Sequence, residues 1–174
     1  GERRVAVVPA AVAGLLKAGA PVHVEADAGA AAGFTDEAYR EAGAEVVSDR
    51  RQLMHAADVV LQVRGLGANL VAGTADLDLL REGLVVIAPC DPLGNPQAIE
   101  LLAERGVTLF AMELIPRITR AQSMDVLSSM ATIAGYKAVL VAANRLPKLF
   151  PMMMTAAGTL APAKVLVIGA GVAG

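Results

Sequence analysis

Residues 80–89 (LREGLVVIAP) carry the pattern that decides the fold: a helical stretch ends at a glycine and continues directly into an aliphatic strand. The pattern occurs three more times, in residues 15–24 (LLKAGAPVHV), 39–47 (YREAGAEVV) and 102–110 (LAERGVTLF). Glycine is favoured just past a helix C-terminus because it adopts positive φ without a steric penalty at Cβ. Short β-branched runs after it are typical of strands buried on both faces. The alternation predicts an α/β fold with a mostly parallel sheet and flanking helices.

Two further signals support this order of helices and strands. Residues 58–63 (DVVLQV) are predicted to form another strand because they are mainly aliphatic and β-branched. Thr35 precedes two acidic residues, and Asn95 precedes a proline, as is typical of residues that begin a helix. We therefore predict that Thr35 and Asn95 are helix N-caps.

The pattern changes after residue 110. Residues 113–123 (ELIPRITRAQS) form a polar, proline-containing loop, and a long helix is predicted after it, from about Met124 to Arg145. Because this helix is poor in charge, we expect it to be packed on protein for most of its length. Residues 164–168 (KVLVI) are predicted to form a new strand.

These predicted elements divide the chain into three segments. Residues 1–125 are expected to form an N-terminal, flavodoxin-like or Rossmann-like α/β domain. Residues 126–160 are expected to be an interdomain helix and linker. Residues 161–174 are expected to be the first strand and glycine turn of a second, Rossmann domain, truncated at that point.

Composition excludes several classes of protein. The 174 residues are 55% hydrophobic and 18% charged, which is too apolar for a disordered chain. The net charge of −2 is scattered along the chain, so no nucleic-acid partner is expected. With one cysteine and two histidines, neither an intrachain disulfide nor a metal site is expected. The best candidate for a membrane span, residues 126–144, is interrupted by Lys137 and is interpreted as a buried protein segment.

The last eleven residues, KVLVIGAGVAG, contain Gly169, Gly171 and Gly174 in a G-x-G-x-x-G pattern directly after the predicted strand. In a dinucleotide site the first glycine permits a tight turn, the second lets the backbone approach a diphosphate, and the third allows close packing. The pattern alone is a weak signal, and a glycine-rich turn without a ligand is the alternative.

A second cluster of polar residues lies in residues 116–129 (PRITRAQSMDVLSS). Arg117, Gln122 and Asp125 lie within nine residues beside an apolar helix, together with a second arginine, Arg120. Arginine supplies fixed donors, glutamine a donor and an acceptor, and aspartate an acceptor for ribose hydroxyls or a carboxamide. The alternative is a capped helix that follows a solvated polar loop.

These segments resemble one known family, the NAD(H)-binding component (alpha, domain I) of proton-translocating NAD(P) transhydrogenases. The resemblance is carried by residues 1–9 (GERRVAVVP), 31–47 (AAGFTDEAYREAGAEVV), 116–143 (PRITRAQSMDVLSSMATIAGYKAVLVAA) and 150–174 (FPMMMTAAGTLAPAKVLVIGAGVAG). The resemblance implies that NAD(H) binds in a cleft between the two domains. The positions that it implies for cofactor binding are Arg117, Ile118, Gln122, Ser123, Met124, Asp125, Ser128, Gly169, Gly171, Val172 and Gly174.

The resemblance also implies a reaction and partners. The reaction is direct hydride transfer between NAD(H) held by this chain and NADP(H) held by a beta component, coupled to proton movement through a membrane component. Two nicotinamide rings exchange hydride without an acid or a base, so no catalytic residue is expected. A homodimer is implied, in the cytoplasm and associated peripherally with the inner membrane through its partner subunits.

Alanine dehydrogenases are similar in fold and in the opening segment, to which Arg4 belongs, and they supply the alternative function. In that family a lysine and a histidine that serve the amino-acid substrate follow two of the strands. Here the two regions read Gln62-Val63-Arg64 and Pro89-Cys90-Asp91, which argues against amino-acid oxidation because the proton lost in forming an imine needs a positioned base. A non-enzymatic fragment of the same fold is a further alternative, and a chain of these 174 residues is expected to be inactive alone.

Overall fold

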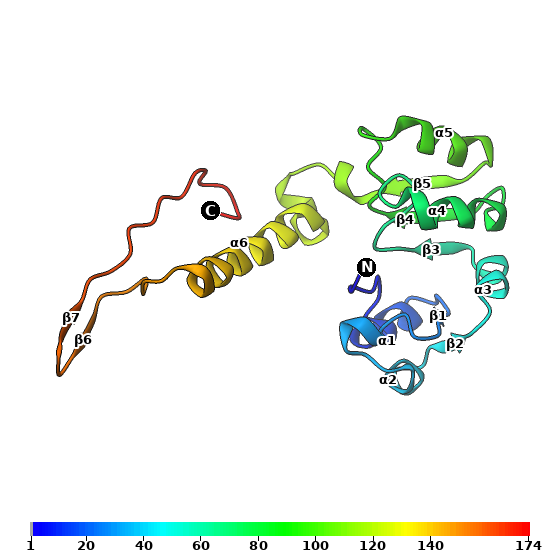
Figure 1. Cartoon of the computed structure of the whole chain (residues 1–174). Helices are drawn as coiled ribbons and strands as arrows, with labels where there is room; N and C mark the ends of the chain where they lie inside the picture. Colours follow the sequence, from blue (N-terminus) through cyan, green and yellow to red (C-terminus); the bar gives the residue numbers. More distant parts are fainter. Residues whose placement is uncertain (1) are drawn as a thin grey trace. The chain divides into compact units, whose positions relative to one another are not determined.

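The computed structural model of the protein describes residues 2–174 and divides into two compact units, Gly1–Leu114 and Ile115–Gly174. Figure 1 labels the helices and strands of both. The elements of the first unit are α1 (Pro9–Lys17), β1 (His23–Glu25), η1 (Ala30–Ala32), α2 (Asp36–Glu41), β2 (Glu45–Val47), α3 (Arg50–Ala56), β3 (Val59–Leu61), α4 (Leu70–Asp76), η2 (Leu77–Leu79), β4 (Val85–Ala88), α5 (Pro96–Glu104), β5 (Thr108–Ala111) and η3 (Met112–Leu114). The boundaries expected at residues 125 and 160 stay predictions.

All strand pairs of the first unit are parallel, which confirms the predicted α/β fold. β1 pairs with β2, and β3, β4 and β5 form a second sheet in that order. Arg50, the first residue of α3, links β1 to α4 through its side chain. Its guanidinium donates to both carboxylate oxygens of Asp76 at the end of α4, at 2.8 and 2.6 Å, and also to Glu25 at the end of β1.

The predicted helix ends and strand starts are confirmed where local chemistry determines them. Gly19, Gly43 and Gly106 follow α1, α2 and α5 with φ of 84°, 96° and 65°. The helical stretch predicted to end at Gly83 is wrong, because η2 ends at Leu79 and Leu80 is extended. Gly83 instead lies in a turn with φ of 79°, and its N–H donates to the Gly106 carbonyl at 3.0 Å. The Thr35 hydroxyl caps α2 by accepting from the Ala38 N–H at 3.3 Å. Asn95 precedes α5 as predicted, but its side chain caps nothing and donates to Asp91 instead.

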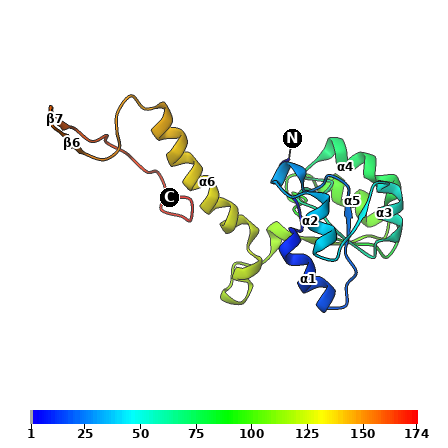
Figure 2. The ribbon, with the colours of Figure 1, turned by 90° about the horizontal axis from the view of Figure 1, so that it is seen from below.

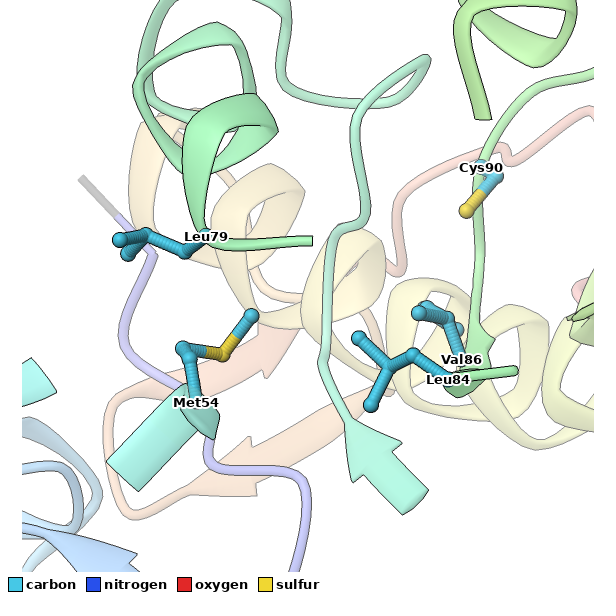
Figure 3. Close-up of a cluster of buried hydrophobic side chains, with 6 residues drawn as sticks. Met54, Leu79, Leu84, Val86 and Cys90 are labelled. Atoms are coloured by element: carbon cyan, nitrogen blue, oxygen red, sulfur yellow. The ribbon is translucent and has the colours of Figure 1, made fainter. Parts of the chain in front are cut away.

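The core of the first unit consists of small aliphatic clusters between the strands and their helices. Figure 3 shows Met54 of α3 and Leu79 of η2 near Leu84, Val86 and Cys90, which lie on β4 or next to it. Leu84 and Cys90 are fully shielded from solvent. Burying a leucine side chain contributes about 1.5–3 kcal/mol, so this cluster holds α3 and η2 on the sheet. A second cluster joins α1, β1 and α2 and contains Val12, Val24, Tyr39 and Ala44.

The second unit contains η4 (Thr119–Met124), α6 (Val126–Arg145) and an antiparallel hairpin of β6 (Met153–Thr155) and β7 (Gly158–Leu160). The sequence predicts that the long helix is packed on protein, but none of its residues is buried. It is also the one described helix long and apolar enough to cross a membrane, by length and composition only. The strand predicted at residues 164–168 is absent because these residues pair with no described strand, and Ile168 is 93% exposed.

Candidate functional site

The polar loop, residues 116–125, leads from the first unit into α6. Most of it forms η4, anchored by the buried side chain of Ala121. The loop members proposed for cofactor binding are otherwise exposed: Arg117, Ile118, Gln122, Ser123 and Met124. Arg117 and Gln122 donate no side-chain hydrogen bond to any of residues 2–174, so their donors are available to a ligand.

Asp125 and Ser128 form a hydrogen-bonded pair at the start of α6. One carboxylate oxygen of Asp125 accepts from the Ser128 N–H at 2.9 Å, and the other accepts from the Ser128 hydroxyl at 2.7 Å. These two bonds, helped by the positive charge of Arg117, lower the pKa of Asp125. Asp125 is therefore both the N-cap of α6 and an ionised acceptor held in one orientation.

The glycine turn, residues 169–174, is closed by a backbone hydrogen bond between two of its own residues. Gly169 has φ of 98°, a conformation that favours glycine, and the Gly174 N–H donates to the Gly171 carbonyl at 3.1 Å. A Cβ at Gly174 would collide with the Gly169 carbonyl oxygen, whereas a Cβ at Gly171 would meet open space. The side chain of Val172 is 58% exposed. The turn thus leaves its middle glycine accessible, which fits the close approach of a diphosphate.

Sequence reasoning missed Glu113, which lies in η3 directly after β5. One of its carboxylate oxygens accepts the N–H groups of Cys90, at 2.7 Å, and of Asp91. The other oxygen is buried and has no hydrogen-bond partner among the described residues. An acidic residue immediately after a predicted strand was the available signal, because the carboxyl ends of parallel strands meet at one edge of a sheet.

Glu113 and the buried end of β4 also affect Cys90, the single cysteine of the sequence. Burial, followed by the negative charge of Glu113, raises the pKa of the Cys90 thiol to about 11. Gly65 packs so closely on Cys90 that a Cβ there would collide with the sulfur. The side chains that follow β3 and β4 remain Gln62 to Arg64 and Pro89 to Asp91, without lysine or histidine.

A depression of the described surface lies elsewhere, around η1 and α2. It is open, has a volume of about 540 Å³, and is lined partly by Asp27, Phe34 and Arg40. None of the predicted cofactor residues lines it. Residues 2–174 contain no group of three or more histidine, cysteine or acidic side chains that would hold a metal ion.

The sequence of the chain is similar to a known protein family and to individual proteins of known name. It matches "Alanine dehydrogenase/PNT, N-terminal domain" over residues 1–134 and the corresponding C-terminal domain over residues 138–174. It is 48% identical over 174 residues to NAD(P) transhydrogenase subunit alpha of Cereibacter sphaeroides, covering 100% of this chain and 32% of that protein. It is 31% identical over 178 residues to alanine dehydrogenase of Bacillus subtilis, covering 99% of this chain and 44% of that protein.

A solved structure gives the same result. The crystal structure of transhydrogenase from Sinorhizobium meliloti is similar with a TM-score of 0.89 and 50% sequence identity, over 99% of this chain and 48% of that one. The chain therefore spans less than half the length of each of these three proteins. The similarity includes the polar loop and the glycine turn, because it extends over nearly all of residues 1–174.

Proposed function

Because the chain belongs to the alanine dehydrogenase/PNT family, we propose that it is the NAD(H)-binding portion of a transhydrogenase alpha subunit. The proposed reaction is direct hydride transfer between NAD(H) on this chain and NADP(H) on a beta component, coupled to proton translocation. The observation that carries this proposal is the oriented Asp125–Ser128 pair beside the unpaired donors of Arg117 and Gln122, in the same compact unit as the glycine turn.

The polar loop fits the nicotinamide end of the cofactor. The guanidinium of Arg117 and the amide of Gln122 supply donors for oxygen atoms, and Asp125 supplies an ionised acceptor for a carboxamide NH₂ or a ribose hydroxyl. Ile118, Ser123 and Met124 are exposed on the same loop and would surround the ring, and Ser128 holds Asp125 in place. The loop therefore offers donors and an acceptor within one short segment.

The glycine turn fits the diphosphate. Gly171 has no protein atom where a Cβ would lie, so the backbone there is open to a ligand that a larger residue would exclude. Val172, between the second and third glycines, would contact the bound cofactor from the same turn. The cofactor supplies the transferable hydride when it is bound. The residues of the chain bind it, orient the ring and exclude water, so none of them needs to act as an acid or a base.

The proposed partners follow from the subunit structure of the relative. The relative from Cereibacter sphaeroides is named a "subunit alpha", and a protein named as one subunit works with others. We propose an NADP(H)-binding beta component and a membrane component as partners, and a homodimer of this chain. The location proposed is the cytoplasmic face of the inner membrane, reached through these partners.

Two variants test the proposal in a protein with a complete dinucleotide-binding domain. Asp125→Asn and Gln122→Ala are expected to weaken NADH binding about tenfold each, as loss of one hydrogen bond to a charged or oriented group implies. Arg120→Gln, a change at an exposed residue of the same 3₁₀ turn, is the matched control. NADH dissociation constants and hydride-transfer rates that are unchanged in Asp125→Asn and Gln122→Ala would refute the assignment.

An assay for the alternative function uses the same protein. L-alanine is expected not to reduce NAD, because the positions after β3 and β4 contain neither lysine nor histidine. Hydride transfer from NADH to an NADP analogue on an added beta component is expected instead. Alanine-dependent NADH formation without such transfer would reverse the choice between the two functions.

A further inference from the structure

Gly135, in the middle of α6, marks the place where the glycine turn meets the long helix. A Cβ built on Gly135 would lie 3.1 Å from the Cα of Ala173 and would collide with the Ala173 carbonyl oxygen. Both residues belong to the second unit, and in Figures 1 and 2 the C-terminal end of the chain lies beside α6. The contact is therefore between backbone and backbone, with no side chain from Gly135 to separate them.

The sequence of α6 agrees with a contact at this point. Small residues recur on one face of the helix at Ala131, Gly135, Ala138 and Ala142, at spacings of four, three and four. Ala131 and Gly135 are partly shielded, whereas nearly all of the helix from Thr132 onward is exposed. Glycine is the poorest helix former after proline, so α6 retains it at a central position against its local preference.

The position of Gly135 along the helix relates the two clusters of the cofactor site. Ser128 and Gly135 are seven residues apart, which is two turns and about 10 Å along a helix axis. The nicotinamide end is assigned to the Asp125–Ser128 pair and the diphosphate to the glycine turn, and a ribose joins these two groups of the cofactor. Their separation in the protein must therefore match that of the ligand.

We infer that Gly135 is a positioning residue of the dinucleotide site: its missing side chain lets the glycine turn lie directly on α6, at a fixed distance from the Asp125–Ser128 pair. The inference rests on the proposed function. A methyl group at this position pushes Ala173 away from the helix and moves the accessible backbone at Gly171 with it. The nicotinamide contacts at the start of α6 are then retained while the diphosphate contacts are lost.

The test compares two glycine-to-alanine substitutions in a protein with a complete dinucleotide-binding domain. Gly135→Ala is expected to weaken binding of both NADH and ADP about tenfold or more, since a displaced turn loses charge-assisted hydrogen bonds to the diphosphate. Gly14→Ala, in α1, is the matched control because a Cβ there meets no atom within 4 Å, and it is expected to change neither affinity. Asp125→Asn is expected to weaken NADH but not ADP, which lacks the nicotinamide.

A measurement on the wild-type protein keeps the inference testable if Gly135→Ala folds poorly. A nuclear Overhauser contact is expected between an Hα proton of Gly135 and Ala173, because a Cβ in place of that proton would lie 3.1 Å from the Cα of Ala173. Gly158, in the same unit, is the control and is expected to show no such contact with Ala173, because no atom lies within 4 Å of a Cβ built on it. Unchanged ADP affinity in folded Gly135→Ala, or absence of the Gly135–Ala173 contact in wild type, would overturn the role of Gly135. A wild-type protein that binds neither NADH nor ADP would instead overturn the proposed function, and with it this inference.

Discussion

Raising the pH from 9 to 11 should destabilise the protein through Cys90. The thiol is fully shielded, and its pKa is raised from 9.0 to about 11 in the folded protein. In the unfolded chain the thiol ionises at an ordinary pKa, so stability is fully present below pH 9 and is lost as the pH rises towards the folded value. A difference of two pKa units corresponds to about 3 kcal/mol, nearly all of it lost by about pH 11.

Cys90→Ala isolates this effect from the other groups that titrate at high pH. Removing the buried sulfur leaves a void of about one methyl group and costs about 1 kcal/mol at pH 7.5. The variant carries no thiol, so its free energy of unfolding should fall less steeply with pH than that of wild type. The two curves are expected to cross near pH 10. Urea unfolding of both proteins at several pH values measures this, and parallel curves between pH 9 and pH 11 would refute the reasoning.

Three further predictions concern packing and charge. Leu84→Ala should lower the free energy of unfolding by about 3–4 kcal/mol in urea titration, because Leu84 is fully shielded in the core cluster of the first unit. Arg50→Met should cost about 1 kcal/mol at low ionic strength and less in high salt, whereas Arg40→Met, which removes an exposed ion pair, should leave the urea midpoint unchanged. Asp125→Ala should reduce helix content by circular dichroism, since α6 loses its N-cap. In wild type the pKa of Asp125 is lowered, so the ionised carboxylate stabilises α6 fully at pH values above the ordinary pKa of aspartate. This stabilisation is lost as the pH falls through the lowered pKa.

The regions of the fold that sequence predicts well are those determined within a few residues. A glycine that ends a helix, as at Gly106, or a hydroxyl that caps one, as at Thr35, depends on its immediate neighbours alone. The parallel sheet follows because these local units can bury their strands in few other ways. Helix–glycine–strand alternation is therefore sufficient to predict the α/β fold.

The interactions that sequence could not supply join residues far apart in the chain. Asn95 has the sequence context of an N-cap, yet its side chain bonds to Asp91, which has φ of 47°. Glu113 accepts N–H groups from residues more than twenty positions earlier, and no local pattern specifies that partner. The strand expected at residues 164–168 needs a hydrogen-bonded neighbour, and the described chain provides none. The composition of the polar loop predicts that it carries hydrogen-bond donors and acceptors. It does not predict which of these side chains are hydrogen-bonded within the protein, as Asp125 is to Ser128.

The pairing of Asp125 with Ser128 explains how one carboxylate serves both the helix and the proposed ligand. An ionised carboxylate has about four acceptor positions, and Ser128 occupies one on each oxygen. The remaining positions are free to accept from a carboxamide or a hydroxyl, and the two existing bonds fix the direction in which they point. Because the same bonds lower the pKa, the acceptor stays charged in the absence of a ligand. The orientation needed for binding is therefore already stabilised by helix capping, so cofactor binding does not have to order this side chain.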